Sequence, residues 1–151
     1  MKAVIQRVKN ADVAVNGETV GKCGNGLMVL FGAETGDTAE DAVLLAKKTA
    51  ALRIFCDENG KMNRSICDIN GEMLVISQFT LCADVKKGNR PSFTGAMEPT
   101  KANELYLLYC EELRKNGIKS VETGIFGADM QVELGNEGPF TLVLTNEELG
   151  F

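Results

Sequence analysis

The sequence predicts an α/β fold: a single domain over residues 1–151, with a mixed, largely antiparallel β-sheet and two main helices. Three observations support this fold class. Apolar, β-branched runs typical of strands recur along the chain, two stretches have the helical period, and Asn-Gly turns precede several predicted elements. The length suits one domain with its own core.

The N-terminal part of the chain predicts a group of strands. Residues 2–9 and 11–15 are rich in the apolar and β-branched residues that strands favour. An Asn-Gly dipeptide, the strongest short signal for a hairpin, leads into a strand at 18–23. Residues 27–31 are apolar throughout, which predicts a strand buried on both faces.

A helical period replaces the strand pattern after this point. Apolar residues recur on one face over 38–51, where Asp37 is expected to cap the helix and Glu40 to complete a capping box. A short strand is expected at 53–56, followed by a turn over 57–60.

A long strand at 72–81 is expected after a second Asn-Gly turn, and its first half is apolar on both faces. A polar loop follows over 82–95. A second helix is expected to begin at a Thr100 cap and to end at Lys115, where another Asn-Gly dipeptide stops it.

Three short strands complete the chain, at 120–123, 130–134 and 140–145. The glycine-rich stretch 124–130 between them favours a turn over a binding loop.

The dipeptide Gly138-Pro139 stands directly before the last predicted strand. Proline cannot donate a ladder hydrogen bond, so it belongs at the first residue of a strand or on a sheet edge. The pair predicts either a rigid tip that offers main-chain atoms to a ligand or a second subunit, or an ordinary turn. The turn is the more common use of Gly-Pro.

Polar residues cluster at the end of the strand predicted at 72–81. Alternation along a strand places Gln78 and Thr80 on one face, with Ser77 and Phe79 on the other. Polar groups at the end of a buried strand either build a site or satisfy the backbone of the next loop, and the pattern fits both interpretations.

The loop that follows is basic although the net charge is −5. Lys86, Lys87 and Arg90 form the one patch suited to phosphate, with Arg64 as a candidate addition. The alternative is a solvated loop with incidental charge.

The composition excludes several kinds of chemistry. The chain has no histidine, which excludes Ser-His-Asp and Cys-His catalysis and histidine-bound metals. Its five cysteines form no C-x-x-C pair, so we expect reduced thiols, no metal site and a cytoplasmic protein. We expect neither a secretory signal nor a membrane-spanning segment.

Several ordered motifs resemble those of the D-aminoacyl-tRNA deacylases. The resemblance covers essentially the whole chain and rests on residues 3–8, 77–81, 88–94, 126–130 and 136–142. Phe140 is a departure, because the family usually has valine there, and it affects little beyond local packing.

This resemblance implies a barrel-like fold and a hydrolase that needs no cofactor. The family cleaves the ester between a D-amino acid and the 3′-terminal adenosine of tRNA, and it also removes misplaced glycine. It is homodimeric, with the active site shared between subunits.

The resemblance also implies roles for individual residues. The residues expected at the reacting end are Ser77, Gln78, Phe79 and Thr80. Those expected to bind substrate and select its chirality are Gln6, Arg7, Met130, Gly138 and Pro139. The Gly-Pro bond is expected to be cis and to enter the partner's pocket, with Arg7 fixing its orientation.

Without histidine, we expect backbone N–H groups near Phe79 and Thr80 to hold the oxyanion and the adenosine 2′-OH to orient water. Thr80 as nucleophile ranks second, because no base activates its hydroxyl. Two other functions stay open: a nucleic-acid-binding module without catalysis, and a hydrolase of small D-amino-acid esters or amides.

Overall fold

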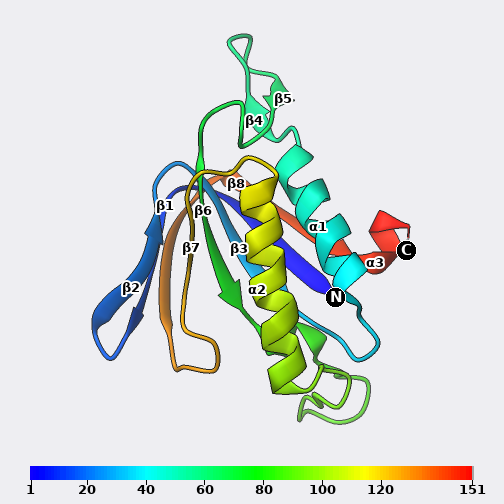
Figure 1. The fold of residues 1–151 in the computed structure, drawn as a ribbon. Coiled ribbons are helices and arrows are strands. Elements are labelled where there is room, and N and C mark those ends of the chain that lie inside the picture. Colours follow the sequence, from blue (N-terminus) through cyan, green and yellow to red (C-terminus); the bar gives the residue numbers. More distant parts are fainter. Residues whose placement is uncertain (151) are drawn as a thin grey trace.

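A six-stranded mixed sheet forms the centre of the protein in a computed structural model that describes residues 1–150 (Figure 1). The strand order is β2-β1-β3-β6-β7, and β8 also pairs with β1. The sheet curves into a nearly closed, barrel-like shape, which confirms the predicted fold class. The strands are β1 Lys2–Val15, β2 Glu18–Cys23, β3 Gly26–Gly32, β6 Glu72–Ser77, β7 Val121–Thr123 and β8 Gln131–Thr145.

Strand β1 organises the sheet. It is continuous where the sequence predicted two strands, and its two halves pair antiparallel with β3 and then with β2. β8 pairs antiparallel with both halves, whereas β6 is parallel to β3 and to β7. The hairpin between β1 and β2 is confirmed, because Asn16 and Gly17 both have positive φ.

Strand β8 is also continuous, which corrects the expectation of two separate strands at 130–134 and 140–145. Gly138 and Pro139 lie inside β8. In the described part of the chain β8 pairs only with β1, so it forms an edge, where proline is tolerated.

Two helices cover one face of the sheet (Figure 1). They are α1 Ala39–Ala51 and α2 Pro99–Lys115, each within one residue of its predicted start and end. The hydroxyls of Thr49 and Tyr109 are 3.0 Å apart where the helices meet, and the ring of Phe31 stacks on Tyr109 with centroids 5.0 Å apart. These contacts lie in the main hydrophobic core.

Four short elements complete the described chain. β4 Phe55–Cys56 and β5 Met62–Arg64 form a two-stranded arm at the top of Figure 1. The 3-10 helix η1 Phe79–Cys82 follows β6, and α3 Asn146–Leu149 follows β8. None of the helices within residues 1–150 is long and apolar enough to cross a membrane.

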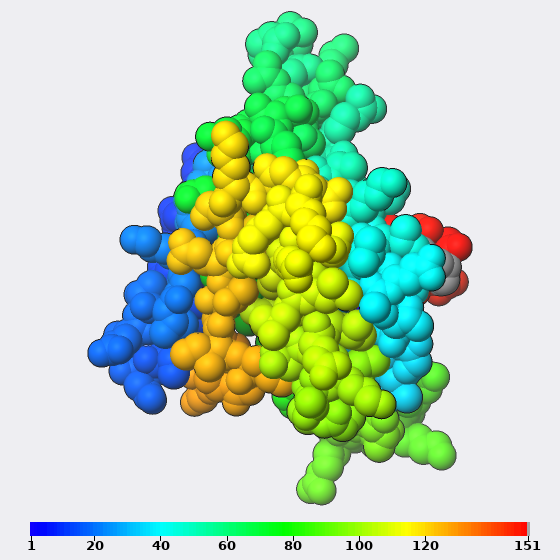
Figure 2. All heavy atoms as spheres, in the orientation of Figure 1, coloured from blue at the N-terminus to red at the C-terminus, as the bar shows by residue number. Residues whose placement is uncertain are grey.

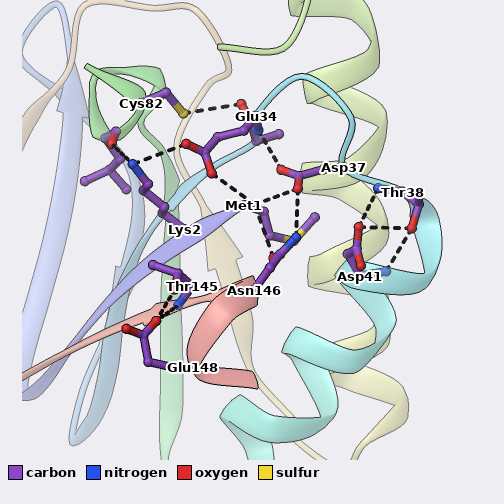
Figure 3. Close-up of polar contacts among 12 residues, drawn as sticks. Met1, Lys2, Glu34, Asp37, Thr38, Asp41, Cys82, Thr145, Asn146 and Glu148 are labelled. Carbon is purple, nitrogen blue, oxygen red and sulfur yellow. Dashed lines mark hydrogen bonds and ion pairs between the residues drawn. The ribbon is translucent and has the colours of Figure 1, made fainter. Parts of the chain in front are cut away.

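The cap of α1 differs from the prediction by one residue. Thr38, not Asp37, is the N-cap, and its partner in the capping box is Asp41 rather than Glu40. Asp37 instead accepts a hydrogen bond from the α-ammonium of Met1 at 2.6 Å (Figure 3). The N-terminus of the chain thus binds the Asp37 carboxylate, which the sequence pattern had predicted to cap α1.

The cap of α2 also lies earlier than predicted. The carboxylate of Glu98, not Thr100, accepts the N–H groups of Thr100 and Lys101 at 2.9 and 3.2 Å. These bonds lower the pKa of Glu98. Pro99 takes the first helical position, where a missing N–H costs nothing, and this moves the cap to the residue before it.

Candidate active site

A cavity of 710 Å³ lies between the end of β6, the start of α2 and the turn that joins β7 to β8. All three are at the lower end of Figure 1. The cavity brings the predicted residues Ser77, Gln78, Phe79 and Met130 together. Most of its other walls are apolar and include Phe93, Met97, Ala102, Phe126 and Val132.

The turn between β7 and β8 has the conformation that the sequence favoured. Ala128 N–H donates to the carbonyl of Ile125 at 3.1 Å, and Gly127 has φ +78°. It also forms part of the cavity wall, so the two interpretations of this stretch are compatible.

The sequence predicted that the reacting end would belong to a strand over 72–81. It does not, because β6 stops at Ser77. Gln78 N–H donates to Phe31 O at 2.7 Å, and the chain then turns into η1. The alternation argument therefore fails at Gln78 and Thr80. The turn from β6 into η1 passes so close to Gly32 that this position must be glycine, since a Cβ there would lie 2.8 Å from the carbonyl oxygen of Gln78.

The turn leaves two backbone donors at the start of η1. Leu81 N–H closes the first turn onto Gln78 O at 3.3 Å, so the N–H groups of Phe79 and Thr80 precede the first bonded turn. The side chain of Gln78 donates to the Thr80 hydroxyl. Thr80 itself does not line the cavity.

The Gly-Pro tip, formed by Gly138 and Pro139, bulges out of β8. Its peptide bond is cis, as the resemblance implied. Gln6 pairs with Thr141 and Val8 with Asn136, so four residues of β8 stand opposite Arg7 alone. The extra residues push the tip out of the ladder.

Arg7 holds the base of this bulge. Its guanidinium donates to the carbonyls of Ile54 at 2.7 Å and Glu137 at 3.4 Å, and it lies 4.8 Å from the centroid of the Phe140 ring. Only 12% of the side chain is exposed. Gly138 has φ +120°, and a Cβ there would lie 3.2 Å from Arg7 Nη2.

Asn136 is a second support that the sequence predictions did not include. Its amide donates to the carbonyls of Arg7 and Phe140, both at 2.9 Å, and so ties β1 to the far side of the bulge. Its place in the 136–142 motif was the available signal. Gln6 lies nearby and donates weakly to the Thr141 hydroxyl at 3.4 Å.

The tip lies away from the cavity of its own chain. Arg7 pairs with Leu27, which pairs with Met73, and Ser77 is four residues further along β6. At about 3.3 Å per residue, this separates the tip from Ser77 by about 13 Å along the strands. Neither residue of the tip lines the cavity.

The predicted basic residues are on an exposed loop beside the cavity. Lys86, Lys87 and Arg90 lie in the 83–95 loop, which projects at the bottom of Figure 2. Arg64 does not join them, since β5 is at the opposite end of the molecule and Arg64 pairs with Glu58. Nothing in the local sequence around Arg64 indicates that separation.

The five cysteines are dispersed and unpaired. Burial raises the pKa of Cys23 to about 11 and that of Cys110 to about 12, so both are protonated at neutral pH. Within residues 1–150 no three acidic or sulfur side chains gather in a way that could hold a metal ion.

Comparisons with known proteins show which family the chain resembles. The family model described as "D-Tyr-tRNA(Tyr) deacylase" matches residues 4–145. A D-aminoacyl-tRNA deacylase of Syntrophotalea carbinolica is 55% identical over 149 residues, which is 99% of each chain. One of Anaeromyxobacter dehalogenans is 53% identical over the same share.

Two solved structures have the same fold. One, named c-Myc DNA Unwinding Element Binding Protein, is 42% identical with a TM-score of 0.90, covering 96% of this chain and 98% of its own. A probable eukaryotic D-amino acid tRNA deacylase is 19% identical with a TM-score of 0.78, covering 95% and 97%. The match over residues 4–145 and relatives more than half identical over nearly their whole length place the chain in the D-Tyr-tRNA(Tyr) deacylase family.

Proposed function

We propose that this protein hydrolyses the ester that joins a D-amino acid to the 3′-terminal adenosine of tRNA, releasing the D-amino acid and tRNA. The observation that carries the proposal is the cavity with Ser77, Gln78 and Phe79 in its wall, in a chain of this family. Its apolar walls suit a nucleoside base and an amino-acid side chain.

The Gly-Pro tip acts as the chirality filter. Arg7 and Asn136 fix its base, so it presents main-chain atoms in one orientation. A rigid tip that meets the substrate with main-chain atoms can accept a D substrate and exclude an L side chain by steric overlap. Glycine has no side chain to exclude, so glycyl-tRNA is also a substrate.

A second copy of the chain supplies this tip. The tip is about 13 Å along the strands from Ser77 of its own chain. β8 is an edge strand with exposed residues, among them Val143, and so leaves a surface for a partner. The protein is accordingly a homodimer with two shared sites, and as an enzyme that acts on aminoacyl-tRNA it works in the cytoplasm.

Hydrolysis proceeds by direct attack of water. The water oxygen bonds to the ester carbonyl carbon, the N–H groups of Phe79 and Thr80 hold the oxyanion, and the bond to the 3′ oxygen breaks. The 3′ oxygen takes a proton that water supplies. The neighbouring 2′-OH of the adenosine orients the attacking water, and no cofactor takes part.

Thr80 supports the site rather than attacking the ester. Its hydroxyl accepts a hydrogen bond from the amide of Gln78. Within residues 1–150 no carboxylate or lysine is hydrogen-bonded to it, so nothing removes its proton. Thr80→Ala is expected to retain activity within about tenfold, measured as single-turnover deacylation of D-Tyr-tRNA. A loss of several orders of magnitude with intact tRNA binding would support the nucleophile instead.

The function itself is tested by deacylation of D-Tyr-tRNA beside L-Tyr-tRNA and Gly-tRNA. We expect rapid release from the D and glycyl substrates and little from the L substrate. Equal rates on D-Tyr-tRNA and L-Tyr-tRNA would show that the Gly-Pro tip does not select chirality. A free D-tyrosine ethyl ester, cleaved as well as D-Tyr-tRNA, would point to a small-ester hydrolase.

A second candidate function is nucleic-acid binding without catalysis, favoured by the name of the neighbour that is 42% identical. The net charge of −5 opposes a large binding surface for duplex DNA. Duplex binding that weakens steeply between 50 and 200 mM salt, without deacylation, would support it.

A further inference from the structure

Two phenylalanines at the mouth of the cavity are exposed, although large apolar side chains are usually buried. Phe79 is 58% exposed and Phe93 36%. Their ring centroids are 5.1 Å apart and the ring planes meet at 68°, an edge-to-face pair. Both also line the cavity. We call Phe79 and Phe93 the aromatic pair.

The aromatic pair is held in place by the backbone. Phe79 belongs to η1, and Phe93 follows the Asp84–Ser92 bridge, whose two hydrogen bonds are 2.8 and 2.9 Å long. After Phe93, Gly95 O accepts the N–H of Thr35 at 2.9 Å. A preformed apolar surface loses little entropy when it binds a ligand.

The charged side chains near the aromatic pair indicate which class of ligand it binds. The same loop carries Lys86, Lys87 and Arg90, and within residues 1–150 none of them is paired with an acidic side chain. Arg90 is three residues from Phe93, so its Cα lies within about 10 Å of that of Phe93. Cavity, aromatic rings and cationic side chains therefore follow one another along this edge.

We propose that the aromatic pair stacks the base of the nucleotide that precedes the terminal adenosine, while the three cations contact the adjoining phosphates. This rests on the proposed function, which places the terminal adenosine in the cavity. Single-stranded nucleic acids are bound in this manner, by stacking on aromatic side chains beside a positively charged path.

The test uses ligands that bind without being hydrolysed. One is adenosine with D-tyrosine in amide linkage at its 3′ position, and the other is the cytidylyl-adenosine dinucleotide with the same group. Titration calorimetry on the intact protein gives the Kd of each. We expect the wild type to bind the dinucleotide more tightly.

Because Phe93 also lines the cavity, Phe93→Ala is expected to weaken binding of both ligands, but to weaken dinucleotide binding about tenfold more than nucleoside binding, since stacking on one ring contributes on this scale. Phe93→Tyr keeps a ring and should bind like the wild type. Leu107→Ala, at an exposed α2 position outside the cavity, is the matched control. Phe79 is left intact because its backbone belongs to the reacting end.

Three results would overturn the inference. The first is equal binding of both ligands by the wild type, and the second is an equal loss of affinity for both ligands in Phe93→Ala. The third is a less stable dimer of Phe93→Ala in sedimentation, which would assign the aromatic pair to a subunit contact. Failure of the proposed function is distinct, since it would appear as no hydrolysis of D-Tyr-tRNA by a wild type that still binds the analogues.

Discussion

At the residue scale, the orientation of the Gly-Pro tip depends on two long-range contacts. Arg7 approaches the bulge from β1 and contacts both Glu137 and Phe140. Asn136 closes it from the other side by donating to two carbonyls. A single side chain larger than hydrogen at position 138 would press on Arg7.

Gly138→Ala is therefore expected to reduce kcat/KM on D-Tyr-tRNA at least tenfold. The Cβ both disfavours φ +120° and lies 3.2 Å from Arg7 Nη2. Backbone strain of this kind costs about 1–3 kcal/mol. Gly36→Ala is the control, since Gly36 also has positive φ, but a Cβ there meets nothing within 4 Å and the residue does not line the cavity. Equal activity losses in the two variants would show that stability alone is responsible.

Asn136→Asp tests the second support. A carboxylate would face the two carbonyl oxygens that the amide now satisfies, which costs about 1–3 kcal/mol and displaces the tip. The loss of stability, measured by urea unfolding, should lessen as the pH falls, because a protonated carboxyl can donate again. Asn10→Asp, at an exposed position of β1, should show no such loss. A pH-independent deficit would contradict this account.

At the element scale, the sequence predicted the helices and most strands but misplaced the N-caps of the helices and the bounds of several strands. Local apolar period determines where α1 and α2 lie, whereas their caps depend on neighbours: Met1 binds Asp37, and Pro99 moves the second cap to Glu98. Strand β6 ends at Ser77, where its partner β3 also ends, at Gly32, and the Leu81 N–H turns back onto Gln78 O to begin η1. Such competing contacts are invisible in a local pattern.

The loop 83–95 carries a prediction of its own. Replacing Lys86, Lys87 and Arg90 with glutamine should flatten the salt dependence of kcat/KM for D-Tyr-tRNA by about two log units per log unit of salt, because each cation that neutralises a phosphate of a single strand contributes about 0.7 to this slope. Activity on D-tyrosyl adenosine should not change. Glutamine at Lys47, Lys48 and Lys61, which removes the same charge elsewhere, should leave the salt slope unchanged. If both triple variants changed the salt slope equally, the effect would come from the net charge of the protein and not from the loop.

At the scale of the whole molecule, the sequence predicted four residues of the cavity wall but not the geometry of the site. Ser77, Gln78, Phe79 and Met130 were predicted and do share one cavity. The Gly-Pro tip was predicted to enter the partner's pocket, and within one chain it stands apart from the cavity. Pairing register along β1, β3 and β6 decides this, and register depends on the complete sheet.

This separation leads to a test in mixed dimers. Ala128→Phe fills the cavity, because Ala128 lines it, and Gly138→Ala disables the tip. Each variant alone is expected to be nearly inactive on D-Tyr-tRNA. When the two are refolded together and the mixed dimer is isolated by two different affinity tags, one of its two sites combines an intact cavity with an intact tip. That dimer should recover about half of the wild-type activity per dimer. A site built within one chain has no such intact combination, so a mixed dimer as inactive as its parents would contradict the shared site.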